Sequence, residues 1–391
     1  MSSNSPKKKI AVVFGTRPEA IKMAPLIRKI RQADCFELKV CVTAQHREML
    51  DMALALFAIS PDHDLDLMSD SQTITEITVR ALAGLEIVFK QEKPDLVLVH
   101  GDTTTTCSAA LAAFYQKTAV GHVEAGLRSG NIYSPYPEEM NRRITTAIAG
   151  LHFAPTEGNR RNLLHCGVDP ERIFVTGNTV IDALHLVARK EYIFAEAALN
   201  RLDYAHKKII LLTAHRRENW GRPLGNIYAA MRTLLSNNPD TELVFPVHMN
   251  PVVKEAAHRA LGAVPGAHLT HPLDYEPFVN LMARSYLVLT DSGGIQEEAP
   301  ALGKPVLVLR AETERPEAVE AGTVKLAGTE KDQIVSLAQE LLTNKAEYEK
   351  MARAVNPYGD GNAAERIVNI LRAHFFADQE KQGVAGLYSG Y

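Results

Sequence analysis

Short apolar runs rich in β-branched residues alternate, along the first half of the chain, with longer segments that have a helical period. A strand followed by a helix, repeated several times, predicts a parallel sheet with helices on its faces. The pattern predicts about six strands in this half. The predicted strands are residues 10–14, 38–42, 96–100, 119–123, 151–154 and 173–176.

A second series of the same kind begins at Lys208 and predicts a second α/β domain. Its predicted strands are residues 209–213, 243–247, 286–290, 305–309 and 324–326. A polar stretch from Lys190 to Lys208 separates the two series, so we place the domain boundary near Val187. We expect Rossmann-like domains at 1–187 and 188–362, and in segment 363–391 a helix that crosses back and a loose tail.

The two halves begin alike, because basic residues follow the first predicted strand in each, at Arg17 and at Arg216-Arg217. Ligands of open α/β sheets bind outside the carboxyl ends of the strands. Two such domains facing each other would therefore hold a ligand in the cleft between them. The alternative is a common strand-to-helix start with no shared purpose.

Composition and absent motifs narrow the class of protein. A net charge of −3 over 391 residues gives no general attraction to nucleic acid or acidic membranes. The four cysteines show no CxxC spacing and no segment approaches ~18 apolar residues, so we expect a cytoplasmic protein without zinc or a membrane span. The sequence lacks G-x-G-x-x-G after a strand, G-x-x-x-x-G-K-[ST] and H-E-x-x-H, which disfavours dinucleotide, P-loop and zincin chemistry, and we expect no cofactor.

Three carboxylates lie near the ends of predicted strands or helices and are candidates for proton transfer. Asp102 follows a strand, although it is also placed to cap the helix that begins at Thr103. Glu138 lies in a first helical turn, where it and Glu139 can pair with arginines four residues on. Glu124 leaves its strand into a glycine-containing loop, which favours a functional role.

The segment 290–298 is a strand end, a small flexible turn and a helix start, which is typical of a phosphate site. The alternative for this segment is a plain strand-to-helix turn in which serine and glycine only allow a tight bend. Glu298, one turn further on, is placed to accept hydrogen bonds from ribose hydroxyls. His215 lies at another strand end beside two arginines that disfavour its protonation, and either a structural or a proton-transfer role fits. Arg315, Arg17 and Lys22 are candidates for completing an anion site, or are surface charges.

Six motifs together resemble the non-hydrolysing UDP-N-acetylglucosamine 2-epimerases, in the right order, from about Lys9 to His374. They are Phe14-Gly15-Thr16-Arg17-Pro18-Glu19, His100-Gly101-Asp102-Thr103, His122-Val123-Glu124-Ala125-Gly126-Leu127-Arg128, Pro137-Glu138-Glu139 with Asn141-Arg142, His215-Arg216-Arg217-Glu218-Asn219 and Asp291-Ser292-Gly293-Gly294. The resemblance implies a two-domain glycosyltransferase-B-like fold, a homodimer and a UDP-sugar in the interdomain cleft.

The resemblance also implies the reaction, which interconverts UDP-N-acetylglucosamine and UDP-N-acetylmannosamine. C2 of the sugar has no acidic proton, so the plausible route expels UDP from C1 as the C2 proton leaves, giving 2-acetamidoglucal, and then reverses this on the opposite face. By resemblance, Asp102, Glu124 and Glu138 are the catalytic carboxylates, and His215 assists near the leaving UDP; which acid takes the proton stays open.

Further residues match binding positions of that family. The nucleotide-binding matches are Arg17, Lys22, Phe278, Ser292, Gly293, Gly294, Glu298 and Arg315. In members activated by a second UDP-N-acetylglucosamine, Gln45, Glu138, Arg216 and His248 match residues that contact the activator, but Ser71 replaces an arginine. Ala311-Glu312 also departs from the usual Asp-Thr before the segment that carries Arg315.

Three alternatives share some of these expectations. A glycosyltransferase of the same fold would transfer the sugar to an acceptor. A related epimerase would act on a UDP-diacetamido-uronic acid. A non-catalytic UDP-sugar sensor would bind without turnover.

Overall fold

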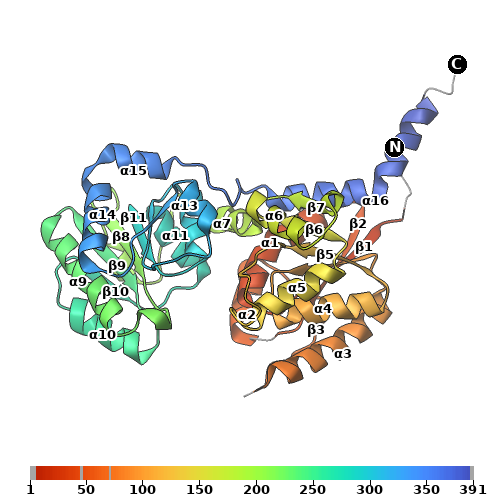
Figure 1. Ribbon diagram of the computed structural model, residues 1–391, viewed down its shortest axis with the longest axis horizontal. Coiled ribbons are helices and arrows are strands. Elements are labelled where there is room, and N and C mark those ends of the chain that lie inside the picture. Colours follow the sequence, from red (N-terminus) through yellow and green to blue (C-terminus); the bar gives the residue numbers. More distant parts are fainter. Residues whose placement is uncertain (1–5, 45–46, 70–71, 388–391) are drawn as a thin grey trace. The chain divides into compact units, whose positions relative to one another are not determined.

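The computed structural model describes residues 6–44, 47–69 and 72–387, and the side chains as far as residue 376. The chain divides into two compact units (Figure 1). Unit 1 comprises Met1–Ala183 and Tyr358–Tyr391, and unit 2 comprises Leu184–Pro357. No helix in the described residues is long and apolar enough to cross a membrane.

Unit 1 is built on a seven-stranded parallel sheet, which confirms the predicted architecture for this half. The strand order is β3-β2-β1-β4-β5-β6-β7. The strands are β1 (Lys8–Phe14), β2 (Phe36–Val42), β3 (His63–Asp64), β4 (Leu96–His100), β5 (Ala119–Val123), β6 (Leu151–Ala154) and β7 (Ile173–Val175). The prediction omitted β3 because its two residues, one histidine and one aspartate, carry no apolar signal.

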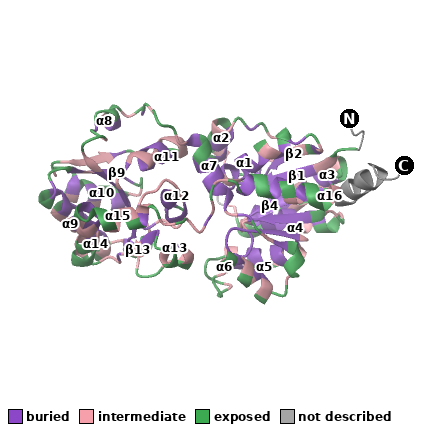
Figure 2. Ribbon diagram, turned by 90° about the horizontal axis from the view of Figure 1, so that it is seen from above, coloured by how far each residue is buried: buried purple, intermediate pink, exposed green. Residues whose placement is uncertain are grey.

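The helices of unit 1 pack on this sheet because their apolar sides and the central strands form one core. Ile10 to Phe14 of β1 are fully buried, as are Leu96 to Val99 of β4 (Figure 2). The helices are α1 (Arg17–Gln32), α2 (Arg47–Leu56), α3 (Ile74–Glu92), α4 (Thr104–Tyr115), α5 (Glu138–Ile148), α6 (Glu157–His165), η1 (Pro170–Arg172), α7 (Thr179–Val187) and α16 (Ala363–Leu387).

The turn from β1 into α1 shows how the sequence sets one of these junctions. The Glu19 carboxylate accepts the backbone N–H groups of Gly15 and Thr16, at 3.0 and 2.9 Å, which satisfies donors that the helix start would otherwise leave open. A Cβ at Gly15 would lie 2.2 Å from Thr43 Oγ1 and 2.4 Å from Thr105 Oγ1. Only glycine therefore fits where β1 meets the neighbouring loops.

Unit 2 repeats the design with a six-stranded parallel sheet of order β10-β9-β8-β11-β12-β13. The strands are β8 (Lys208–Thr213), β9 (Thr241–Pro246), β10 (Ala267–Thr270), β11 (Leu287–Thr290), β12 (Val306–Val308) and β13 (Val324–Leu326). The helices are α8 (Ala197–Asn200), η2 (Arg217–Asn219), α9 (Arg222–Asn237), α10 (Pro251–Leu261), α11 (Tyr275–Arg284), α12 (Ile295–Ala301), α13 (Pro316–Glu320), α14 (Lys331–Thr343) and α15 (Lys345–Ala352). The prediction omitted β10, a short edge strand in which only Ala267 and Leu269 alternate with polar residues.

The last helix, α16, belongs to unit 1. The Asp182 carboxylate of α7 accepts the N–H groups of Ala363 and Ala364 at 3.1 and 2.9 Å, so a distant side chain holds the start of α16. Midway along the helix, Phe375 packs edge-on to Phe36 of β2. The helix continues to Leu387, so residues 379–387 of the expected loose tail are helical in the structure.

Candidate active site

The first part of the site lies at the carboxyl ends of β4 and β5. These strands are parallel neighbours, with His100 opposite Val123, and the Gly101 N–H donates to the Val123 carbonyl at 2.9 Å. Asp102 and Glu124 follow directly, so the fold brings two of the predicted carboxylates to one edge of the sheet. The buried His122 ring bonds the Gly101 carbonyl at 2.7 Å through Nε2, which fixes the backbone beside Asp102.

Glu124 has a left-handed backbone, with φ of 62°. This conformation is unfavourable by roughly 1 kcal/mol or more for a residue with a Cβ, and such residues concentrate at functional sites. Gly126, two residues on, packs so closely on α6 that an added Cβ would lie 2.4 Å from the Asn159 carbonyl oxygen. The loop geometry that sets the Glu124 backbone is therefore fixed by packing against a neighbouring helix.

Two basic side chains surround the Glu124 carboxylate. Lys22 Nζ of α1 lies 2.6 Å from Oε2 and 2.8 Å from Oε1, and His100 Nε2 lies 2.8 Å from Oε2. Burial alone would raise the pKa of Glu124, but the charges of Lys22 and His100 outweigh it and hold the pKa well below its usual range. Glu124 is therefore an ionised carboxylate at neutral pH, and Lys22, expected at a phosphate, is its ion-pair partner.

Asp102 does not cap a helix, so the structural alternative for this residue is wrong. The cap of α4 is Thr103, whose hydroxyl accepts the Thr106 N–H at 3.1 Å. Asp102 Oδ2 is instead bound by Arg142 of α5, from Nε at 2.8 Å and from Nη2 at 2.7 Å. Asn141 also donates to the Asp102 carbonyl at 2.9 Å, so two consecutive residues of α5 hold this turn.

Glu138 and Glu139, adjacent at the start of α5, have different surroundings. The fully buried Glu139 binds Arg142 at 3.2 Å and Arg143 at 3.1 Å and accepts the Ser129 N–H at 3.0 Å. The arginine pairing expected for both acids thus belongs to Glu139. Glu138 Oε2 is buried and has no hydrogen-bond partner among the described residues. An unpaired buried carboxylate oxygen is costly for folding, which favours a role in chemistry.

Arg142 is one of the residues of this site that were not predicted from the sequence. It bridges Asp102 and Glu139, and only 9% of its side chain is exposed. Its spacing of three residues after Glu139 was visible in the sequence, but its contact with Asp102, 40 positions away, was not.

The second part of the site lies in unit 2, at the ends of the neighbouring strands β8 and β11, where Thr213 pairs with Thr290. Asp291 is fully buried here. Its Oδ2 accepts the N–H groups of His215 and Arg216, at 2.8 and 2.9 Å, and the Asn219 amide at 3.0 Å. Asp291, not predicted as a site residue, therefore fixes the loop that presents His215.

The His215 ring lies between charges of both signs. Its Nδ1 is 3.3 Å from Asp291 Oδ1, and its ring stacks on His248 at a centroid distance of 5.5 Å. Burial lowers the pKa of His215, assisted by His248 and Arg216, while Asp291 opposes the shift. The imidazole is therefore largely neutral at pH 7, in agreement with the expected effect of the neighbouring arginine.

The turn after β11 is open to a ligand and lies beside two arginines. A Cβ at Gly293 would be 3.9 Å from both Arg216 Nη2 and the Arg315 guanidinium. Arg315 Nε binds Glu297 of α12 at 2.5 Å, and the Arg315 N–H donates to Thr313 Oγ1 at 3.1 Å. The segment carrying Arg315 is thus anchored, although it differs from the usual sequence at Ala311-Glu312.

The other predicted binding residues lie on elements around these two sheet edges. Arg17 is the first residue of α1, in unit 1. Phe278 is half-buried on α11. Tyr275, also on α11, interacts with Glu298 of α12. Burial raises the pKa of Tyr275, and the Glu298 carboxylate raises it further. Gln45 and Ser71 lie outside the described residues. Across the described residues, no group of three or more histidine, cysteine, aspartate or glutamate side chains is arranged to hold a metal ion.

Residues 28–372 match the profile of a family described as UDP-N-acetylglucosamine 2-epimerase. The Bacillus subtilis strain 168 protein named UDP-N-acetylglucosamine 2-epimerase is 56% identical over 369 residues, which cover 94% of this chain and 96% of that protein. The crystal structure of UDP-GlcNAc 2-epimerase from Neisseria meningitidis bound to UDP-GlcNAc superimposes with a TM-score of 0.83 at 51% identity, covering 93% of this chain and 99% of the other. The glycotransferase of kitacinnamycin, at 14% identity and a TM-score of 0.62, shares the fold alone, over 93% of this chain and 99% of the other. The predicted glycosyltransferase-B-like fold is confirmed.

Proposed function

The chain belongs to the UDP-N-acetylglucosamine 2-epimerase family, and we infer that it is an isomerase that interconverts UDP-N-acetylglucosamine and UDP-N-acetylmannosamine. The observation that carries this function is the set of carboxylates in unit 1. Asp102 and Glu124 follow adjacent strands, each bound by a basic partner, and one buried oxygen of Glu138 has no partner among the described residues. Inverting C2 requires proton transfer on both faces of the sugar, and this set supplies more than one proton-transfer group.

The proposed reaction has two stages and consumes no water. In the first, a carboxylate removes the C2 proton, the C1–O bond to UDP breaks with its electrons on UDP, and a C1–C2 double bond forms. In the second, a protonated group on the other face returns a proton to C2, and the UDP oxygen re-forms the bond to C1. The intermediate is 2-acetamidoglucal with UDP held beside it.

We assign the proton-transfer roles to Asp102, Glu124 and Glu138. Arg142 and Lys22 act as positioning residues, because each holds a carboxylate in place through an ion pair of 2.7 or 2.6 Å. Lys22 and His100 keep Glu124 ionised, so Glu124 enters the reaction without a bound proton. The bridge from Arg142 to Glu139 ties Asp102 to the helix that begins with Glu138.

We assign UDP binding to the end of the β11 strand and its surroundings in unit 2. Ser292, Gly293 and Gly294 present a turn beside Arg216 and Arg315, whose positive charges would stabilise the negative charge that develops on departing UDP. His215, held by Asp291, is placed to donate a hydrogen bond to the leaving group. Phe278 and Glu298 are further proposed nucleotide contacts in unit 2, and Arg17 of unit 1 is proposed as a nucleotide-binding residue by resemblance alone.

An exchange experiment in D2O tests the function. The protein is incubated with UDP-N-acetylglucosamine alone, and both sugars are analysed by NMR and mass spectrometry. We expect one deuterium at C2 of each epimer, with no free UDP accumulating. A Glu124→Gln variant prepared in parallel shows whether the exchange comes from a contaminating host enzyme.

Other outcomes of the same experiment would identify the alternatives. Turnover only after a sugar acceptor is added would indicate a glycosyltransferase. Preferential turnover of a UDP-diacetamido-uronic acid in competition would indicate the related epimerase. Binding of UDP-N-acetylglucosamine with no exchange in wild type would indicate a sensor.

We further propose that the enzyme is a cytoplasmic homodimer. Val79 and Ile87 on α3 are 60% and 67% exposed, and Phe114 and Tyr115 at the end of the adjoining α4 are 59% and 62% exposed. Exposed apolar side chains gathered on two packed helices are typical of an interface between subunits. Sedimentation velocity tests this, since Val79→Glu with Ile87→Glu should shift a dimer toward the monomer.

We also propose that a second UDP-N-acetylglucosamine molecule activates the enzyme. The residues proposed to contact this activator are Gln45, Glu138, Arg216 and His248. Two of these, Arg216 and His248, lie beside His215 in unit 2. An activator held there would contact the residue that serves the leaving group. A sigmoidal dependence of the rate on UDP-N-acetylglucosamine that becomes hyperbolic in His248→Ala would support it.

A further inference from the structure

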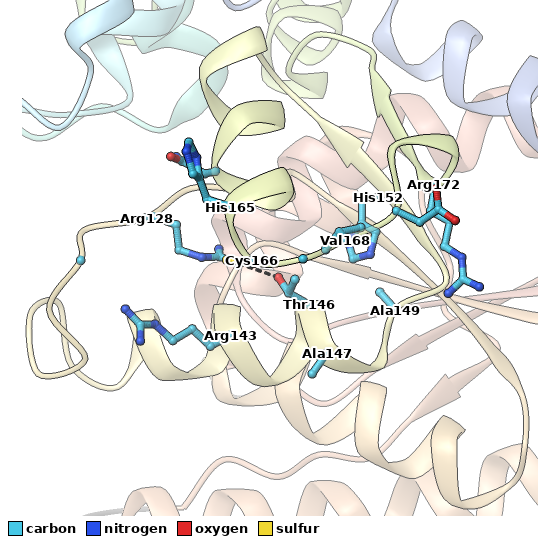
Figure 3. Close-up of a pocket in the computed structure, with 14 residues that line it drawn as sticks. Arg128, Arg143, Thr146, Ala147, Ala149, His152, His165, Cys166, Val168 and Arg172 are labelled. Carbon is cyan, nitrogen blue, oxygen red and sulfur yellow. Dashed lines mark hydrogen bonds between the residues drawn. The ribbon is translucent and has the colours of Figure 1, made fainter.

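A pocket of about 850 Å³ lies in unit 1 outside the carboxylate site (Figure 3). Its walls come from α5, from the end of α6 and from the loop that leads into η1. The carboxylates proposed for catalysis and the residues proposed for UDP binding are not among the residues that line it. Its volume is in the range of about 300–1,000 Å³ that is common for small-molecule sites.

The charge of the pocket is positive. Arg128, Arg143 and Arg172 all line it, against one acidic residue, Asp169. One carboxylate oxygen of Asp169 already accepts a hydrogen bond from the Glu171 N–H, at 3.0 Å. In the view of Figure 3, Arg128 and Arg143 lie at one side of the pocket and Arg172 at the other. A ligand with negative groups at both ends would meet a cation at each.

Arg128 is held rigidly and has no acidic partner in the part of the chain that the structure describes. Its Nη1 donates to the Leu127 carbonyl and its Nη2 to Thr146 Oγ1, both at 2.8 Å. Its Nε is buried and makes no hydrogen bond to any described residue. Within the described ranges, no carboxylate lies within ion-pair distance of either Arg128 or Arg172. A fixed guanidinium in the pocket wall whose charge no described carboxylate neutralises favours the binding of an anion in the pocket.

The electrostatic potentials of Arg128 and Arg172 overlap at His152, which forms a buried part of the pocket wall. His152 of β6 is almost fully buried and lines the pocket. Burial, with a smaller contribution from the charges of Arg128 and Arg172 and against the Ala149 backbone, lowers the pKa of His152 to about 4. The positive potential of both arginines therefore extends into the same space.

We propose that this pocket binds a small anion with two or more phosphate or carboxylate groups, as a site separate from the UDP-sugar site. Guanidinium groups bind both kinds of oxyanion through paired, charge-assisted hydrogen bonds. Arg128 supplies a fixed positive charge in the pocket wall, and the more exposed Arg143 and Arg172 contact the ligand from either side.

Hydrogen bonds and ion pairs connect the pocket to the segments that carry Glu124 and Asp102. Asn162, in its wall, donates to the Gly126 carbonyl at 3.0 Å, two residues after Glu124. Arg143, at its edge, shares the Glu139 carboxylate with Arg142, which holds Asp102. An anion bound here would therefore contact residues that position the reacting groups.

Titration calorimetry of the full chain tests the proposal at physiological ionic strength. Saturating UDP first fills the nucleotide site, and inorganic pyrophosphate or citrate is then added in separate experiments. We expect at least one of the two anions to bind. Tighter binding of pyrophosphate would indicate a preference for phosphate groups, and tighter binding of citrate a preference for carboxylates. Arg172→Gln should weaken its binding about tenfold, as expected for the loss of one charge-assisted contact. Arg143→Gln with Arg172→Gln should weaken it more.

Arg160→Gln is the matched control, because Arg160 lies on α6 but does not line the pocket. It should bind the probe as wild type does. The proposal is overturned if neither anion binds the UDP-saturated protein, if Arg172→Gln binds as tightly as wild type, or if Arg160→Gln loses as much affinity. Since binding is measured without turnover, failure of this proposal is distinguishable from failure of the epimerase function.

Discussion

The Lys22 ammonium lies 2.6 Å from the Glu124 carboxylate, joining the first helix of unit 1 to the loop after β5. Both side chains are largely buried, at 21% and 11% exposure, so solvent screens the pair only weakly. The pair fixes the ionisation state of the residue whose backbone is also the most constrained of the three carboxylates.

Stability should depend on pH through Glu124. Its folded pKa is below the unfolded value of about 4.3, so its ionised form stabilises the fold above that pH, and this contribution is lost as pH falls through the folded pKa. Urea unfolding from pH 7 to pH 3 should show Glu124→Gln less stable than wild type at pH 7. The difference should narrow below about pH 4. A constant difference over this range would contradict the ion-pair account.

Replacing Lys22 by Met should change the pH dependence of the reaction, because Lys22 lowers the pKa of Glu124. Without the ammonium, only His100 opposes the effect of burial, so the pKa of Glu124 should rise. The acid limb of the kcat/KM profile should move to higher pH, and turnover at pH 7 should fall about 10-fold to 100-fold. Lys29→Met, on the exposed side of α1, is the control and should leave the profile unmoved.

Asp102→Asn should reduce kcat by roughly 100-fold or more, since Asp102 is proposed to transfer a proton, while UDP binding is kept. Thr103→Ala is the informative neighbour. It removes the cap of α4 and should cost about 1 kcal/mol of stability with most turnover retained. Stopped assays give kcat, and chemical denaturation gives the free energy of unfolding. Equal losses of stability in the two variants would return Asp102 to a structural role.

Glu138→Gln and Glu139→Gln form a pair of adjacent substitutions with opposite expected effects. Glu138→Gln should lower kcat by about 100-fold without lowering the free energy of unfolding, because no described residue pairs with its buried oxygen. Glu139→Gln should destabilise the fold by about 3 kcal/mol, since it leaves Arg142 and Arg143 without their shared charge. If Glu138→Gln unfolds the protein as readily, its proposed role in proton transfer loses its support.

Asp291→Asn should lower the pKa of His215 further, because the negative charge that opposes the downward shift is removed. NMR titration of the imidazole measures this directly. His248→Phe removes the other ring and should move the pKa of His215 upward, since His248 is among the causes of the lowering. Shifts of the same sign in both variants would be inconsistent with the geometry described for this loop.

The sequence alone determined the class of fold and the positions of most strands. Hydrophobic periodicity is a local property, so runs such as 10–14 and 96–100 were sufficient to predict parallel sheets with helices on both faces. It also placed Asp102, Glu124, His215 and the Ser292–Gly294 turn at strand ends, because an apolar run that stops at a polar residue marks such an end. The two strands it missed, β3 and β10, are short edge strands without a run to detect.

Only the tertiary structure decided which of these residues act together. Whether Asp102 caps α4 or binds Arg142, and whether Glu138 or Glu139 takes the arginines, depends on the positions of backbone and side chains on different elements. Lys22 reaches Glu124 across 102 positions, and Asp291 reaches His215 across 76. Such contacts exist because parallel strands far apart in the chain become neighbours, and local periodicity contains no information about which strands do so.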